Sequence, residues 1–94
     1  MKKNILIIED DEFFGSLISK KLSDDGFEIS LSPDGERGFD SAVKEKPDLI
    51  LLDLLLPGID GFEVLTRMKE DPEISQTPVI FYRIWAKEKT WKED

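Results

Sequence analysis

The chain has 94 residues, enough for one small domain, with 39% apolar residues for a core and 36% charged residues for its surface. A net charge of −8 argues against direct binding to nucleic acid or to an anionic membrane, because basic patches hold both. The absence of Cys and His excludes disulfides, thiolate or imidazole metal sites and histidine-based acid–base catalysis. The apolar run near the N-terminus is too short for a signal peptide, so we expect a cytoplasmic protein.

The first half of the chain alternates between strand and helix patterns. Four acids, residues 9–12, directly follow a short β-branched run, and apolar side chains at helical spacing come after them. Further on, a segment that alternates with period two is followed by a turn and a second helical pattern. The expected elements are a strand at residues 5–8, a helix that stops near Gly26, a strand at residues 27–31 and a helix that stops at Lys46.

The longest apolar run, residues 49–56, predicts a central strand that is covered on both faces. Asp53 interrupts this run, and a buried strand rarely carries an acid because removing a charge from water is costly. We therefore expect Asp53 at the end of the strand, facing a crevice at the carboxyl edge of the sheet, where open α/β sheets bind ligands. The alternative is an Asp that merely caps a turn.

The second half continues the same alternation. Asp60 and Glu63 have the spacing of a capping box and predict the start of a third helix, which should end at Asp71 before a proline. Residues 79–82 then predict a fourth strand. Strands that alternate regularly with helices predict an α/β fold with a parallel sheet and helices on its faces.

Three acids are expected to converge at the carboxyl edge of this sheet. Glu9 and Asp10 follow the first strand, and Asp53 ends the third. Three neighbouring carboxylates repel one another unless a cation lies among them, and oxygen ligands alone favour a hard ion such as Mg²⁺. Such a cation would leave one carboxylate as a nucleophile, and Asp53 is the candidate because it follows the central strand.

The acidic pair after residues 5–8, the lone Asp53, the Pro57-Gly58 pair and the Asp60-Gly61 pair strongly resemble the receiver domain of two-component response regulators. The resemblance covers residues 3–82. It implies a flavodoxin-like, doubly wound parallel sheet of order 2-1-3-4 with three helices, truncated relative to the family. It also implies Mg²⁺ as cofactor and a histidine kinase or phosphotransfer protein as partner.

The resemblance also implies residue roles. Asp53 would accept the phosphoryl group, Asp10 would bind Mg²⁺ directly, and Glu9 would act mostly through water. The backbone carbonyl of Leu55 would complete the protein's share of the coordination. Asp11 is interpreted as an acid at the start of a helix. This makes the chain a signalling acceptor and not an enzyme.

The chain departs from the family after the fourth strand. Arg83 stands where receivers carry a Ser or Thr, and the family's further strand with its Lys, and its last helices, have no counterpart in the sequence. The lysines that remain lie in a charged segment that nothing places in the site. We therefore expect a truncated receiver domain at residues 1–82, an atypical tail at residues 83–94, and impaired switching.

Two alternatives compete with this interpretation. The chain could be an interaction or dimerisation module that derives from a receiver and is not phosphorylated. It could also be a phosphatase of the haloacid dehalogenase type, but such enzymes place a second Asp two residues after the nucleophile, where this chain has Leu55. In either receiver interpretation we expect a homodimer, because an uncovered fourth strand offers unpaired backbone groups to another chain.

Overall fold

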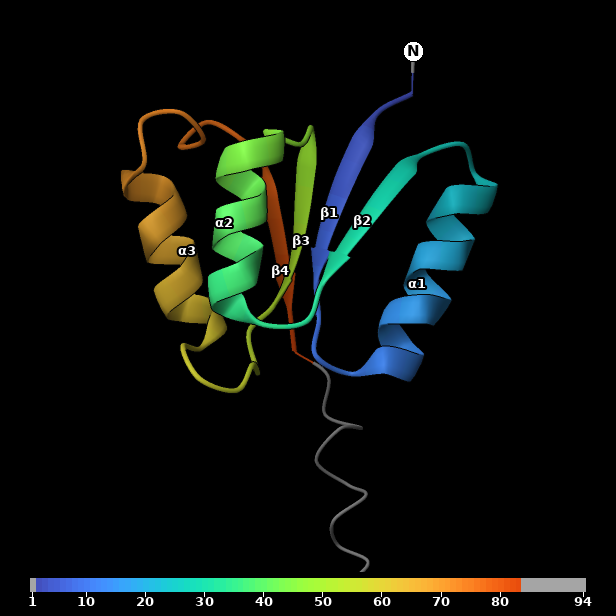
Figure 1. The fold of residues 1–94 in the computed structure, drawn as a ribbon, viewed down its shortest axis with the longest axis horizontal. Helices are drawn as coiled ribbons and strands as arrows, with labels where there is room; N and C mark the ends of the chain where they lie inside the picture. The colour runs from blue at the N-terminus through green and yellow to red at the C-terminus, as the bar shows by residue number, and fades with distance from the viewer. Residues whose placement is uncertain (1, 84–94) are drawn as a thin grey trace, which may run out of the picture.

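The computed structural model describes residues 2–83, and strands and helices alternate throughout these residues (Figure 1). Each strand is short, and each is followed by a helix except the last described one. The elements are β1 (Asn4–Ile8), α1 (Glu12–Asp24), β2 (Glu28–Ser32), α2 (Gly35–Glu45), β3 (Leu49–Asp53), α3 (Gly61–Glu70) and β4 (Val79–Tyr82). The predicted elements are confirmed, with boundaries that differ by a few residues at most.

The strands form one parallel sheet of order β2-β1-β3-β4. The predicted flavodoxin-like order 2-1-3-4 with three helices is therefore confirmed for the described residues. β1 and β3 lie side by side in the middle, with Ile8 opposite Leu52. Because the two strands are parallel and end at the same level, the residues that follow them meet at one edge of the sheet.

The helices divide between the two faces of the sheet. α2 and α3 lie together on one face, and α1 lies on the other, next to β2 (Figure 1). The main core lies between the sheet and the α2–α3 layer. Its buried residues are Leu6, Ile8, Ala42, Ile50, Leu52, Leu54, Leu56, Val64, Met68 and Ile74.

The expectation that β3 is covered on both faces is wrong for one face. Ile50 and Leu52 point toward α2 and α3 and are fully buried, whereas Leu49 and Leu51 on the opposite face are only half-buried. The difference follows the position of α1, which packs mainly on β2. An apolar run indicates that a strand is buried, but it does not say how completely each face is covered.

Aspartates begin all three described helices. Asp11, Asp34 and Asp60 each accept a hydrogen bond from a backbone N–H in the first turn, which satisfies a donor that the helix cannot use itself. The N-cap predicted for Asp60 is confirmed, with Glu63 N–H donating to Asp60 Oδ1 at 3.0 Å. The Glu63 side chain accepts a hydrogen bond of 3.1 Å from Arg67, one turn further on.

Gly61 sets how closely α3 approaches the end of β3. A Cβ at this position would lie 2.4 Å from Leu54 Cα and 2.6 Å from the Asp53 carbonyl oxygen. The Gly61 N–H donates to the Leu54 carbonyl at 3.2 Å. Glycine therefore allows the helix to start directly against the strand that carries Asp53, with no side chain between them.

The described part of the chain contains no helix with the length and hydropathy needed to cross a membrane. Of the predicted tail, only Arg83 is described, and it lies directly after β4. The rest of the tail, residues 84–94, lies outside the described residues.

Candidate functional site

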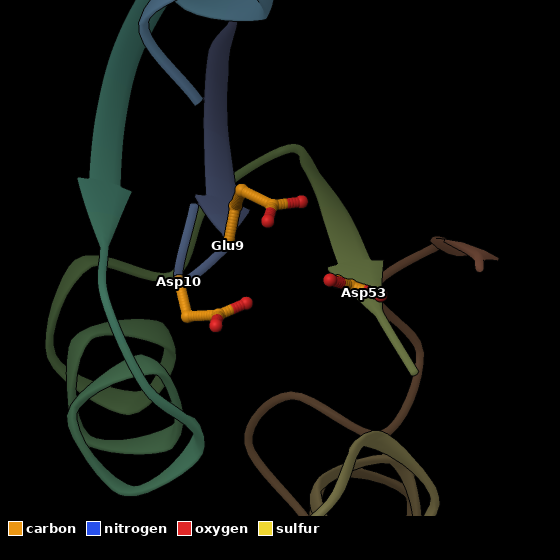
Figure 2. Close-up of side chains that lie close together, drawn as sticks. All are labelled: Glu9, Asp10 and Asp53. Carbon is orange, nitrogen blue, oxygen red and sulfur yellow. The ribbon is translucent and has the colours of Figure 1, made fainter. Parts of the chain in front are cut away.

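The carboxyl edge of the sheet brings together the three acids singled out from the sequence. Glu9 and Asp10 follow β1, and Asp53 is the last residue of β3. One carboxylate oxygen from each lies within 4.8 Å of the others. Figure 2 shows the Glu9 and Asp10 side chains extending from one side of a shared space and Asp53 facing them from the other. The convergence inferred from a parallel sheet is confirmed.

Asp53 is fully buried, with 0% of its surface exposed. Its Oδ1 accepts a hydrogen bond of 2.9 Å from the backbone N–H of Leu55, which fixes the orientation of the carboxylate. Burial of a charged group is tolerated only where polar or charged partners compensate for the lost water. Asp53 thus lies at the end of the strand as expected. The hydrogen bond from the Leu55 N–H is also one that an Asp capping a turn would accept, and it is compatible with a chemical role for the carboxylate.

Glu9 is almost as deeply buried, with 3% of its surface exposed, and both of its oxygens are hydrogen-bonded. Oε2 accepts from the backbone N–H of Asp11 at 3.0 Å. Oε1 accepts from the Tyr82 hydroxyl at 2.7 Å, a contact between residues that are 73 positions apart in the sequence. The Glu9 carboxylate is therefore fixed from two sides before any ligand is considered.

Tyr82 is the residue of this site that the sequence interpretation missed. It is the last residue of β4 and pairs with Asp53 across the β3–β4 ladder, so its side chain belongs to the same face and the same edge. Burial, the hydrogen bond to Glu9 and the negative charges of Glu9, Asp53 and Asp10 raise the pKa of Tyr82 above its usual value. The hydroxyl is therefore a neutral donor. A polar group at the end of a predicted parallel strand was the signal that could have identified it.

Asp11 and Leu55 are the two other residues to which the sequence analysis gave a role. Asp11 is the N-cap of α1 and accepts from the Phe14 N–H at 2.9 Å, which confirms its interpretation as a helix-start acid. Leu55 lies two residues beyond Asp53, where its N–H orients the acid. Its predicted role as a carbonyl ligand stays a prediction.

The donor set suits a hard divalent cation. It consists of carboxylate oxygens only, and the chain has no His or Cys that would favour zinc or another soft ion. Asp10 is the exposed member of the three, so the cluster has one side open to solvent. Mg²⁺ commonly binds one or two carboxylates and keeps several waters, and a cluster with an exposed member suits that mode of binding.

Arg83 follows Tyr82 directly and is exposed. The backbone of Tyr82 is held to β3, because the Leu54 N–H donates to the Tyr82 carbonyl at 2.8 Å. The position that follows β4 is thereby fixed relative to Asp53. At that position this chain carries a guanidinium group and no hydroxyl.

Comparisons with known proteins agree with the fold. Response regulator PleD of Caulobacter vibrioides is 38% identical over 80 residues, which cover 85% of this chain and 18% of PleD. The DNA-binding dual master transcriptional regulator RpaA of Synechocystis sp. is 42% identical over 76 residues, which cover 81% of this chain and 32% of RpaA. The chain thus spans only a minor part of these relatives.

Solved structures give the same result. The N-terminal domain of a response regulator receiver protein from Methanoculleus marisnigri JR1 has a TM-score of 0.82 at 29% identity, covering 84% of this chain and 64% of that one. The phosphorylated cyanobacterial phytochrome response regulator RcpA has a TM-score of 0.79 at 32% identity, covering 88% of this chain and 66% of that one. The family model for the response regulator receiver domain matches residues 5–93, beyond the expected boundary at residue 82. The chain therefore belongs to the response regulator receiver domain family of two-component signalling.

Proposed function

We propose that Asp53 is the phosphoryl acceptor of this receiver domain and that Glu9, Asp10 and Asp53 bind Mg²⁺ beside it. The observation that carries the proposal is the convergence of three carboxylates within 4.8 Å at the carboxyl edge of a receiver fold. The carboxyl ends of central strands are a common location for chemistry in α/β folds, and Asp53 is a deeply buried acid at such an end. The backbone carbonyl of Leu55 is the proposed fourth protein ligand.

The proposed reaction is transfer of a phosphoryl group to a carboxylate. An Asp53 oxygen forms a bond to phosphorus as the bond from phosphorus to the leaving group breaks, and the leaving group departs with that electron pair. The leaving group is the imidazole of a phosphohistidine or, in the test below, acetate. The Leu55 N–H holds the attacking carboxylate in place. When bound, Mg²⁺ supplies positive charge for the phosphoryl oxygens and offsets the repulsion between the acids.

A mass measurement tests the acceptor. The protein is incubated with Mg²⁺ and acetyl phosphate, and its intact mass is compared with that of Asp53→Asn treated in the same way. We expect the mass of one phosphoryl group to be gained by the wild type and not by the variant, and no gain when EDTA is present from the start of the incubation. A gain of equal size in Asp53→Asn would place the modification elsewhere.

Thermal unfolding tests the metal. An ion that binds only the native protein stabilises it by mass action, so Mg²⁺ at 100 times its Kd should add about 2.7 kcal/mol to the free energy of unfolding. Asp10→Asn should lose most of the resulting rise in Tm. Asp24→Asn is a matched control, because Asp24 is an exposed acid that pairs with Lys20 at the far end of α1. A rise that survives in Asp10→Asn with Asp53→Asn would put the ion outside this cluster.

We also propose that phosphorylation switches this domain weakly. A modification shifts a conformational equilibrium only through contacts that differ between the two states. Arg83 occupies the position where the family's hydroxyl would make such a contact. We expect beryllofluoride to cause amide chemical-shift changes confined to the surroundings of Asp53, and Arg83→Thr to extend them. Large changes at β2 or α1 in the wild type would contradict weak switching.

The proposed partner is a histidine kinase or a phosphotransfer protein in the cytoplasm, with the domain acting as acceptor and not as an enzyme.

A second proposed activity is self-association through β4. Within residues 2–83, β4 pairs with β3 only, and Ile80 and Phe81 are 55% and 52% exposed. A strand edge with apolar neighbours is a template for another strand. Sedimentation equilibrium at micromolar concentration tests this, and a single species at the 10.8 kDa monomer mass would contradict the homodimer.

A further inference from the structure

The hydroxyl of Tyr82 donates a 2.7 Å hydrogen bond to Glu9, one of the three clustered acids. We propose that Tyr82 is a positioning residue that acts through Glu9 to make the acid cluster select Mg²⁺ over the larger Ca²⁺. The inference rests on the proposed function, since it concerns the same cation site. It assigns to a residue of β4 a role in the choice of ion, separate from the roles of the acids themselves.

The position of Tyr82 is set by the sheet and not by the hydrogen bond alone. Tyr82 pairs with Asp53 in the β3–β4 ladder, and its carbonyl accepts from the Leu54 N–H at 2.8 Å. Its side chain is half-buried on the face of the sheet that carries Asp53. The backbone thus fixes the direction from which the hydroxyl approaches Glu9, and the ring has little freedom to follow a Glu9 side chain that moves.

Glu9 is consequently held from two directions. One oxygen accepts from the Tyr82 hydroxyl, and the other accepts from the Asp11 N–H at 3.0 Å. A carboxylate that moved into direct, two-oxygen contact with a cation would have to give up at least part of this arrangement. Glu9 is 3% exposed, and at such a buried position the loss of a hydrogen-bond donor is costly. Glu9 would thereby be held back from direct contact with the ion and would act on it through water.

Mg²⁺ and Ca²⁺ differ in how many protein oxygens bind them directly. Mg²⁺ requires an octahedral shell at about 2.0–2.1 Å and keeps several waters, whereas Ca²⁺ takes about six to eight oxygens, often with two from one carboxylate. A Glu9 that is held back leaves a site with few direct protein ligands, which Mg²⁺ fills with water. A Glu9 that is released could contribute two more oxygens, and this would favour Ca²⁺.

The test compares the Kd values of Mg²⁺ and Ca²⁺ by isothermal titration calorimetry. Tyr82→Phe removes the hydroxyl and keeps the ring, and we expect the ratio of the Ca²⁺ Kd to the Mg²⁺ Kd to fall by about tenfold, the scale of one hydrogen bond to a charged group. Phe81→Leu is the matched control, because Phe81 is the neighbouring aromatic residue on the opposite face of β4. This control should leave the ratio unchanged.

Measurements in a Glu9→Gln variant distinguish a positioning role of Tyr82 from a merely structural one. Loss of packing would lower the Tm and weaken both ions together, and would leave their ratio as it was. In Glu9→Gln, which removes the charge that Tyr82 holds, adding Tyr82→Phe should no longer change the ratio. A ratio that Tyr82→Phe leaves unchanged overturns the inference while the proposed cation site stands. A wild-type protein that binds neither ion overturns both.

A spectroscopic measurement on the wild type does not depend on the folding of any variant. Tyr82 is the single Tyr of the chain, so the tyrosine bands of the Raman spectrum come from it alone and report the hydrogen bonding of its hydroxyl. Saturation with Mg²⁺ should leave these bands unchanged, because Glu9 stays in place. Saturation with Ca²⁺ should shift them, because Glu9 is drawn away. Equal shifts with both ions would overturn the inference.

Discussion

The two faces of the sheet are built from the same apolar strands and are covered very differently. On the face toward α2 and α3, the side chains of β3 are fully buried, as Ile50 and Leu52 show with 0% exposure each. On the face toward α1, Leu51 is half-buried and Ile80 on the next strand is 55% exposed. Two helices that pack against each other cover the middle of the sheet on their face. On the opposite face Ile5 and Ile7 of β1 are buried, but β3 and β4 stay partly exposed.

The difference leaves an open groove beside β3 on the α1 face. Its volume is about 480 Å³, and most of its lining is apolar. The lining residues are Lys3, Ile5, Leu22, Phe27, Asp48, Leu49, Leu51 and Ile80. Since hydrophobic stabilisation follows the apolar area removed from water, the α2–α3 face should contribute most of the stability of the domain. The following variants test whether the α2–α3 face contributes more to stability than the α1 face.

The largest expected effect separates two neighbouring leucines of β3. Leu52→Ala opens a cavity in the α2–α3 core and should lower the free energy of unfolding by about 2–5 kcal/mol. Leu51→Ala removes a side chain that is only half-buried on the α1 face, and should cost about 1 kcal/mol. Urea denaturation of both variants checks the difference. Equal losses would mean that the two faces are equally covered in solution.

A smaller effect is expected from two glycines in helices. A Cβ on Gly38 of α2 would lie 2.5 Å from Ile8 Cδ1, and Ile8 is fully buried and cannot move aside. Gly38→Ala should therefore destabilise the protein by about 1–3 kcal/mol through overpacking. The measurement is the change in denaturation midpoint at constant m-value.

The matching glycine on the other face should behave in the opposite way. A Cβ on Gly15 of α1 would lie 3.2 Å from the end of the Leu31 side chain, which is 42% exposed and has room to rotate. Gly15→Ala should then gain up to about 1 kcal/mol from its better helix propensity. Destabilisation of the same size at both positions would show that α1 is packed as tightly as α2.

The smallest effect on stability is expected at the outer strand. Ile80→Lys places a charge on a side chain that already has 55% of its surface exposed, so the free energy of unfolding should change by no more than about 0.5 kcal/mol. If β4 forms the proposed homodimer, the same change should shift sedimentation equilibrium toward the monomer. A large loss of stability would mean that Ile80 is covered in solution, and an unchanged dimer would place the interface elsewhere.

The sequence by itself determined the order of the elements, the parallel sheet and the acids of the candidate site. Each of these depends on local chemistry. The apolar run that begins at Leu49 favours a strand, Asp60 caps the helix that it precedes, and acids that follow parallel strands meet at one edge. This is why Glu9, Asp10 and Asp53 could be grouped although Asp10 and Asp53 are 43 positions apart in the chain.

Only the tertiary structure decided how completely each face is covered and which further group reaches the acids. The contact between Tyr82 and Glu9 joins residues 73 positions apart and depends on the register of β4 against β3, which no local pattern specifies. The half-burial of Leu51 depends on where α1 lies across the sheet. Both are outcomes of packing between distant segments, and a periodicity read along one segment carries no information about the distance to another.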